Sequence, residues 1–179
     1  MKKFLVAISF LTISVLLNGC LVFHKVSYTV QPNGAKGGTA TLYFEDIKSD
    51  AIGNKEFEED KNALFEYMLS SDEFISEMKK EGKKIKSREL YVDNNKLFGK
   101  IVFSYDKISE VEGMQYQDGF YFLTIPPTDS VISTNGVVVP SKDHKRIMWD
   151  KSIKELKFEM LSDAPKAGLR ELAPFYTKE

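Results

Sequence analysis

Few side chains of this 179-residue sequence have the types and spacing that catalysis or metal binding needs. There are two histidines, His24 and His144, and a single cysteine, Cys20. A metal site uses several His, Cys, Asp or Glu ligands at fixed spacing, and neither an HExxH nor a CxxC pattern occurs. His24 falls in a predicted strand and His144 in a predicted turn, which favours structural roles for both. We therefore expect no metal and no other cofactor.

Carboxylates offer a second route to catalysis. The densest acidic cluster, Glu58-Glu59-Asp60, could supply a general acid or base. It lies near the start of a predicted helix, where the helix dipole favours acids, so a solvated acidic face is the simpler interpretation. No GxSxG nucleophile motif is present. The sequence favours a protein that is not an enzyme, and an enzyme without a recognisable motif is kept as an alternative.

The glycine-rich stretch NGAKGGT, residues 33–39, invites comparison with phosphate-binding loops. Such a loop places Gly-Lys-Ser/Thr at the start of a helix, so that backbone N–H groups and the helix dipole meet the anion. Here Lys36 precedes the paired glycines and a strand pattern follows. The stretch therefore predicts a hairpin turn.

The elements around these residues follow from hydrophobic periodicity. Alternating apolar residues at 22–30 and 38–47 predict a first hairpin. Helical spacing over 54–81 then predicts two helices, 55–69 and 71–81, or one kinked helix, with a capping box at Ser70-Ser71-Asp72-Glu73.

Strand patterns joined by turn signals return after Gly82, a predicted helix cap. The expected fold class is α+β, because the helices are segregated from the strands. It would be a hairpin-rich antiparallel β-sheet of about 7–9 strands, with the helical pair inserted after the first hairpin and packed on one face.

The N-terminal residues have the pattern of an export signal. Lys2 and Lys3 precede a fourteen-residue apolar stretch, 4–17. That stretch is shorter than the roughly 20 residues that span a bilayer, and it has the length of a signal h-region, roughly 7–15 residues. A later stretch, GFYFLTIPP, is also too short to span. The basic residues and the short apolar stretch at the N-terminus therefore predict export.

The sequence LLNGC resembles the end of a bacterial lipoprotein signal peptide. Leu17, Gly19 and Cys20 match the family pattern, while Asn18 stands where a small residue is usual. The resemblance implies a signal peptide at 1–19, cleavage before Cys20, a diacylglycerol thioether on the Cys20 sulfur, and an acyl chain such as palmitate on its amine. Two or more acyl chains make membrane binding stable. The alternative is an ordinary secretory signal followed by an unpaired cysteine.

The expected mature chain, 20–179, is long enough for a single α+β domain with its own core. Loss of Lys2 and Lys3 would leave 23 basic and 26 acidic side chains, so the net charge of about −3 argues against nucleic acid as a partner. No polar tether follows Cys20, which places the domain against the membrane surface. We expect a lipid-anchored location in the bacterial cell envelope. The outer membrane is slightly favoured over the inner, because Leu21 is not an acidic retention residue.

The mature chain is similar in outline to the LppM-like envelope lipoproteins of unassigned function. The similarity rests on the hairpin VSYTVQPNGAKGGTATLYF, the inserted helical pair and the late segment NGVVVPSKDHKRIMWD. It implies an antiparallel sheet with helices packed on it, and binding at the envelope rather than catalysis. No functional residue is carried over from it.

Two groups of residues are candidates for binding. Apolar side chains of the strands and helices could form the wall of a pocket for a lipid-like ligand, although a plain core is the alternative. The wall candidates are Phe74, Met78, Tyr121, Phe122 and Trp149. Six basic side chains within ten residues could contact anionic headgroups, although a solvated helix end and outer strand face would explain them too. These are Lys79, Lys80, Lys83, Lys84, Lys86 and Arg88.

The expected function is therefore that of a membrane-anchored envelope lipoprotein with a non-enzymatic binding or structural domain. A carrier or sensor of a lipid-like apolar ligand is the first alternative. The expected partners are the membrane, through lipidated Cys20, together with an envelope protein or an apolar ligand.

Overall fold

The computed structural model describes residues 21–161 and 168–177. The predicted signal peptide and Cys20 lie outside the described residues, so their cleavage and lipidation stay predictions. Within the described ranges, no helix is both long enough and apolar enough to cross a membrane.

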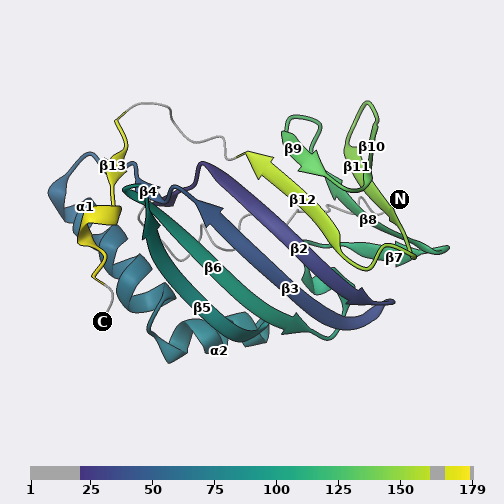
Figure 1. The fold of residues 1–179 in the computed structure, drawn as a ribbon, viewed down its shortest axis with the longest axis horizontal. Helices are drawn as coiled ribbons and strands as arrows, with labels where there is room; N and C mark the ends of the chain where they lie inside the picture. Colours follow the sequence, from purple (N-terminus) through teal and green to yellow (C-terminus); the bar gives the residue numbers. More distant parts are fainter. Residues whose placement is uncertain (1–20, 162–167, 178–179) are drawn as a thin grey trace, which may run out of the picture.

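A twisted six-stranded antiparallel sheet forms the main layer (Figure 1). Across it, the strands run in the order β5 (Lys84–Asp93), β6 (Lys96–Tyr105), β3 (Lys36–Glu45), β2 (Lys25–Asn33), β12 (Leu156–Leu161) and β9 (Val131–Thr134). Between β2 and β3 the chain turns at Gly34, whose φ of 64° lies in the left-handed region that glycine adopts freely. NGAKGGT is thus part of a hairpin, as predicted.

Two smaller sheets complete the β structure. One has four strands in the order β10 (Val137–Pro140), β11 (Lys145–Asp150), β8 (Phe120–Ile125) and β7 (Gln115–Gln117). The other has three strands of two residues each, in the order β1 (Leu21–Val22), β4 (Lys48–Ser49) and β13 (Arg170–Glu171). Figure 1 shows the two small sheets at opposite ends of the large one.

The helical segments lie near β5, at the end that carries the three-stranded sheet (Figure 1). Helix α1 (Asn54–Asn62) continues directly into the π-helix η2 (Ala63–Met68), and α2 (Asp72–Lys80) follows. Two short 3₁₀ turns are η3 (Ile108–Glu110) and η4 (Ala173–Phe175). After α2 the chain turns at Gly82, with φ 84°, as expected for a helix that ends at a glycine.

One face of the six-stranded sheet carries the core, and its opposite face is largely polar. Along β2 and β3 the buried residues alternate with more exposed ones, as expected when only one face of an antiparallel sheet is covered. The helices and the four-stranded sheet contribute to the same hydrophobic cluster, with Leu64 from η2 and Trp149 from β11. The Trp149 ring lies 5.8 Å from Phe158 of β12, which stacks on Tyr28 of β2 at 4.5 Å.

The protein is thus an α+β fold of antiparallel sheets with helices, as predicted. The predicted single sheet of about 7–9 strands was wrong, since the described residues form 13 strands in three sheets. The excess comes mainly from two-residue strands, which are too short to show alternation. The predicted strand at 22–30 divides for this reason: Val22 in β1 pairs with β4, whereas β2 begins at Lys25 and pairs with β3.

Candidate functional site

An apolar cleft lies between η2 and the inner face of the six-stranded sheet. Its cavity volume is about 30 Å³, close to the space of one water molecule. Residues from β3, β5, β6, η2 and the segment before β2 line it, and they include Phe23, Phe44, Leu64, Met68, Arg88, Leu90 and Gly99. Gly99 keeps the cleft open, because a Cβ there would lie 3.2 Å from Ile47 and 3.4 Å from both Leu90 and Phe44.

The roof of the cleft is the π-helix. Its wider register is visible in the hydrogen bond from Leu69 N to Leu64 O, five residues back. Arg88 closes the end of this roof by donating to the carbonyls of Met68, at 3.1 Å, and Ser71, at 2.8 Å. Burial lowers the pKa of the Arg88 guanidinium. Arg88 therefore fixes the helix junction to β5.

A second, larger hollow has a mixed polar and apolar lining and opens at the turn between β5 and β6. It has a volume of about 520 Å³ and is lined by Lys48, Val92, Asn94, Asn95, Lys96, Glu171, Ala173 and Pro174. Its lysines are paired: Lys48 Nζ lies 2.8 Å from Glu171 and 3.3 Å from Asp46, and Lys96 Nζ lies 3.7 Å from Asp46. The hydrogen bond with Glu171 is the main cause of a raised pKa for Lys48.

Asp46, beside this hollow, combines a left-handed backbone conformation with a largely buried side chain. Its φ of 56° is left-handed, a region that Asp visits more readily than most residues. It is 9% exposed, and its Oδ1 has no hydrogen-bond partner in the structure. The site is therefore a largely buried carboxylate that forms ion pairs with two lysines.

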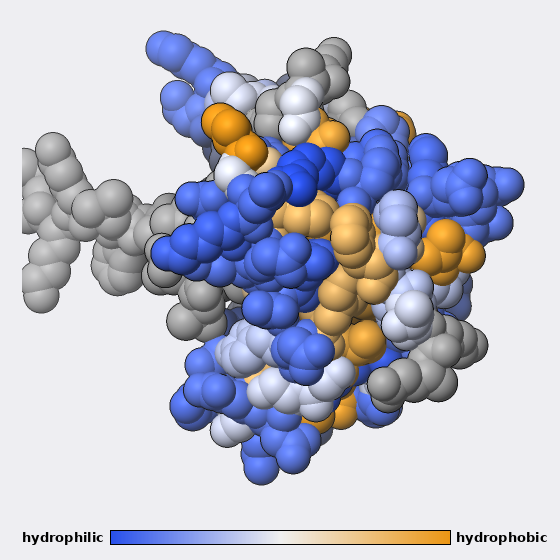
Figure 2. All heavy atoms as spheres, turned by 90° about the vertical axis from the view of Figure 1, so that its left-hand side faces the viewer, coloured by the Kyte–Doolittle hydropathy of each residue, from blue (hydrophilic) through white to orange (hydrophobic). Residues whose placement is uncertain are grey.

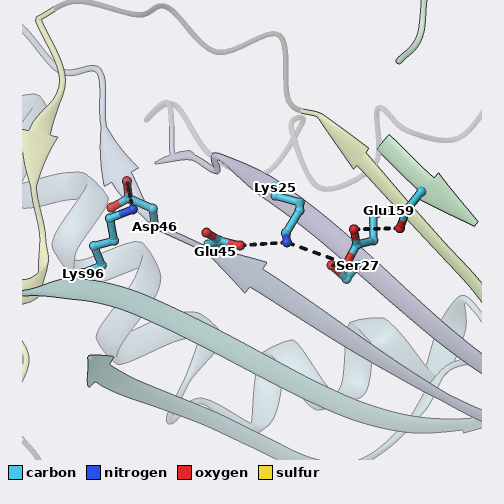
Figure 3. A network of polar contacts seen from close by, with 7 residues as sticks. Lys25, Ser27, Glu45, Asp46, Lys96 and Glu159 are labelled. Carbon is cyan, nitrogen blue, oxygen red and sulfur yellow. Dashed lines mark hydrogen bonds and ion pairs between the residues drawn. The ribbon is translucent and has the colours of Figure 1, made fainter. Parts of the chain in front are cut away.

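The open face of the six-stranded sheet carries a polar network across β3, β2, β12 and β9 (Figure 3). Lys25 Nζ lies 3.0 Å from Glu45 and 3.6 Å from Glu159. Glu159 also accepts hydrogen bonds from Ser27, at 3.3 Å, and Ser133, at 2.8 Å. Glu45 raises the pKa of Lys25, and the Ser133 hydroxyl lowers the pKa of Glu159. Both groups stay charged near neutral pH, so the network stabilises the sheet rather than exchanging protons.

The acidic cluster of α1 is not uniformly solvated, and the expectation for Asp60 was wrong. Glu58 and Glu59 are exposed, but Asp60 is 0% exposed and accepts a hydrogen bond from Ser49, which is also fully buried. The Asp60 pKa is raised mainly by burial. The sequence carried a signal for this, because Asp60 follows Phe57 by three residues and precedes Leu64 by four, on the apolar stripe.

A partly buried carboxyl, Glu112, was missed by sequence reasoning. It follows η3 with a φ of 50°, and its carboxylate bonds to the hydroxyl of buried Tyr28. Burial raises the pKa of both groups. The pair ties the η3 loop to β2, and its only sequence signal is the Glu-Gly dipeptide of a turn.

The five predicted wall residues are not gathered around one cavity. Tyr121 and Trp149 are cross-strand partners on β8 and β11, while Phe122 points to the opposite face, 5.1 Å beneath Arg146. Phe74 and Met78 lie on α2, where Phe74 packs edge-on against Tyr67 of η2 at 5.9 Å. Tyr121 and Trp149 belong to the main hydrophobic core, Phe74 and Phe122 are buried outside it, and Met78 is only partly buried.

The predicted basic group is divided too. Lys79 and Lys80 are exposed at the end of α2. The others have partners: Lys83 with Glu81 at 3.3 Å, Lys84 with Asp106 at 2.7 Å, Lys86 with the Thr39 hydroxyl at 3.2 Å, and Arg88 as above. Four of the six basic side chains therefore have polar partners within the domain.

The two histidines are apart, with His24 exposed between β1 and β2 and His144 before β11. Across the described part of the chain, no group of three or more His, Cys, Asp or Glu side chains is arranged to hold a metal ion. Comparison with protein-family models, with curated proteins and with solved structures found no match to this chain.

Proposed function

We propose that this protein is a non-enzymatic binding or structural domain, held on the bacterial cell envelope by a lipid on Cys20. The observation that carries the proposal is the position of the cysteine. Cys20 directly precedes β1, and β1 is hydrogen-bonded into the fold through β4. An acylated Cys20 would leave no free tether, so the domain would work at the membrane surface.

Lipidation is tested by expression of the full chain in a bacterium with isotopically labelled palmitate. The wild type is expected to incorporate label and fractionate with membranes, and the signal-peptidase inhibitor globomycin should cause the uncleaved form to accumulate. The matched control is Cys20→Ser, which should carry no label. Export of an unlabelled wild type cut at another site would contradict the proposal.

A second candidate function, carriage or sensing of a lipid-like apolar ligand, is favoured by the π-helical roof over the apolar cleft. π-Helical turns occur frequently at functional sites. Because the cleft holds only about 30 Å³, a ligand would enter only if η2 moved away from the sheet.

Ligand carriage is tested by extracting the purified chain with organic solvent and measuring co-purified lipids by mass spectrometry. Gly99→Leu would fill the cleft and should abolish a specific lipid signal, whereas Val102→Leu on the other face of β6 should not. If the co-purified lipid is still detected with Gly99→Leu, it is bound outside the cleft, for example around the lipid anchor or in residual detergent, and the carrier function is contradicted.

A further inference from the structure

The end of the molecule that carries β1 is defined closely by strand pairing. Leu21 pairs with Ser49 of β4, and Ser49 pairs on its other side with Arg170 of β13. Consecutive Cα atoms are about 3.8 Å apart, so Cys20 attaches within one residue of this three-stranded sheet. A lipid anchor on Cys20 would therefore place the membrane close to β1, β4 and β13.

The chain next to β4 exposes an isoleucine to water. Ile52 is 102% exposed, the highest value among the exposed large hydrophobic residues of the described chain. It follows Ser49 by three residues, so their Cα atoms lie within about 11 Å of each other. Burial of a fully exposed isoleucine side chain is favourable by about 1.5–3 kcal/mol of free energy. Ile52 therefore favours an apolar or interfacial environment.

An exposed aromatic ring lies at the same end. Arg170 donates to the carbonyl of Gly53 at 3.1 Å, and its guanidinium lies 3.7 Å from the centre of the Phe57 ring. Phe57 contacts Phe175 at 5.3 Å, and Phe175 is 48% exposed. Lys61 completes the group with its Nζ 4.5 Å from the Phe175 ring and 2.7 Å from the Glu58 carboxylate. Apolar and aromatic side chains beside cations are typical of segments that lie at a membrane interface.

We propose that the anchor-end surface, formed by Ile52, Lys61, Arg170 and Phe175, lies on the bilayer that holds the lipid of Cys20. Figure 2 shows this end of the molecule, where apolar residues form a band between hydrophilic ones. The proposal rests on the lipidation of Cys20 proposed above, and it gives the anchored domain a defined orientation.

The orientation differs from the one that the basic residues of α2 and β5 predicted. β5 has ten residues and therefore spans about 30 Å from Lys84 to Asp93. Its last residues adjoin the hollow lined by Lys48 and Glu171, at the anchor end, whereas Lys79 to Lys84 lie at its start. With the anchor-end surface on the bilayer, the basic side chains from Lys79 to Lys84 lie away from the headgroups.

The test uses the lipidated full chain in vesicles of phosphatidylethanolamine and phosphatidylglycerol. Cys20 is the only cysteine, so each of Ile52→Cys, Phe175→Cys and Val137→Cys supplies one free thiol for an environment-sensitive NBD fluorophore. Val137 is the matched control, because it is 66% exposed and lies on β10 at the opposite end of the molecule (Figure 1). All three positions are exposed, so the labels leave the core intact.

Quenching by a nitroxide lipid and by dissolved iodide reports which label is in the bilayer. Interfacial side chains enter the lipid boundary by about 5–10 Å, so labels at 52 and 175 should be quenched by the nitroxide lipid about twofold more than the label at 137. Iodide should show the reverse order. Equal quenching at all three positions, or protection of 52 and 175 from both quenchers by a protein partner or second copy, would overturn the proposal.

Failure of the anchor and failure of the orientation give different results. Wild-type protein is labelled in parallel, and dye on Cys20 would show a free thiol, which removes both the anchor and the basis of the orientation. Wild-type protein that takes up no dye and floats with the vesicles keeps the anchor. In that case, unquenched labels at 52 and 175 overturn the orientation alone.

Discussion

Asp60 shows at the scale of one residue how folding changes a carboxyl group. Its folded-state pKa is raised by burial on the inner side of α1, and the hydrogen bond from the Ser49 hydroxyl only partly offsets this increase. A raised pKa means that the folded state holds the proton more tightly than the unfolded state does. The free energy of unfolding contributed by Asp60 is therefore fully present below its ordinary pKa, about 3.9, and is lost as the pH rises through the folded-state pKa.

Asp60→Asn should remove this pH dependence and keep a side-chain oxygen for Ser49. We expect the free energy of unfolding of the variant, relative to wild type, to increase as the pH rises from about 3.5 to 7. Urea unfolding at several pH values measures it, and Glu66→Gln, at an exposed position of η2, controls for loss of one surface charge. A difference that is the same at every pH would show that Asp60 does not titrate in this range.

The helical pair shows at the scale of elements what the sequence could and could not predict. Its position and length were predictable because Phe57, Leu64, Phe74 and Met78 follow helical spacing. The cap of the second helix was predicted at Ser70, but the Ser71 hydroxyl accepts from Glu73 N, at 2.9 Å, while Ser70 donates to Phe65 O. The π-helix has more residues per turn than an α-helix, and this shifts the end of the first helix. No local sequence pattern predicts that shift.

Pairings between distant segments were equally hidden. β4 joins β1 to β13 through two residue pairs on each side, and no turn motif links these segments. The apolar cleft and the larger hollow near Lys48 and Glu171 both depend on such long-range contacts. Hydrophobic periodicity could predict the elements that form them, but not that these elements pack together. Asp60 was predictable in principle, because its place on the apolar stripe of α1 is local information.

Ser71→Ala tests the cap of α2 directly. Loss of an N-cap hydroxyl costs about 0.5–2 kcal/mol, because a backbone N–H at the start of the helix loses its partner. We expect a lower free energy of unfolding in urea titrations. Ser76→Ala on the exposed face of the same helix removes a hydroxyl without removing a cap, and should leave stability unchanged or slightly higher. Equal effects of the two substitutions would argue against the cap.

At the scale of the whole molecule, Trp149 joins two layers. It is 1% exposed on β11, contacts Phe158 of the six-stranded sheet, and donates from Nε1 to Asn135 Oδ1 at 2.9 Å. The same Asn135 oxygen accepts from Lys157 N of β12 at 2.8 Å. A residue in this position couples the four-stranded sheet to the rest of the core, which explains its burial without a ligand.

This coupling predicts cooperative unfolding of the lipid-free mature chain. Trp149 is the only tryptophan, so its fluorescence reports the junction of the two sheets, while far-UV circular dichroism reports all the secondary structure. We expect both signals to change at the same urea concentration, and Trp149→Ala to lower the free energy of unfolding by about 3–5 kcal/mol. Val138→Ala, at an exposed position of neighbouring β10, is the control and should have little effect. A fluorescence change that precedes the loss of circular dichroism would show that the four-stranded sheet unfolds alone, and that the chain contains two folding units rather than one.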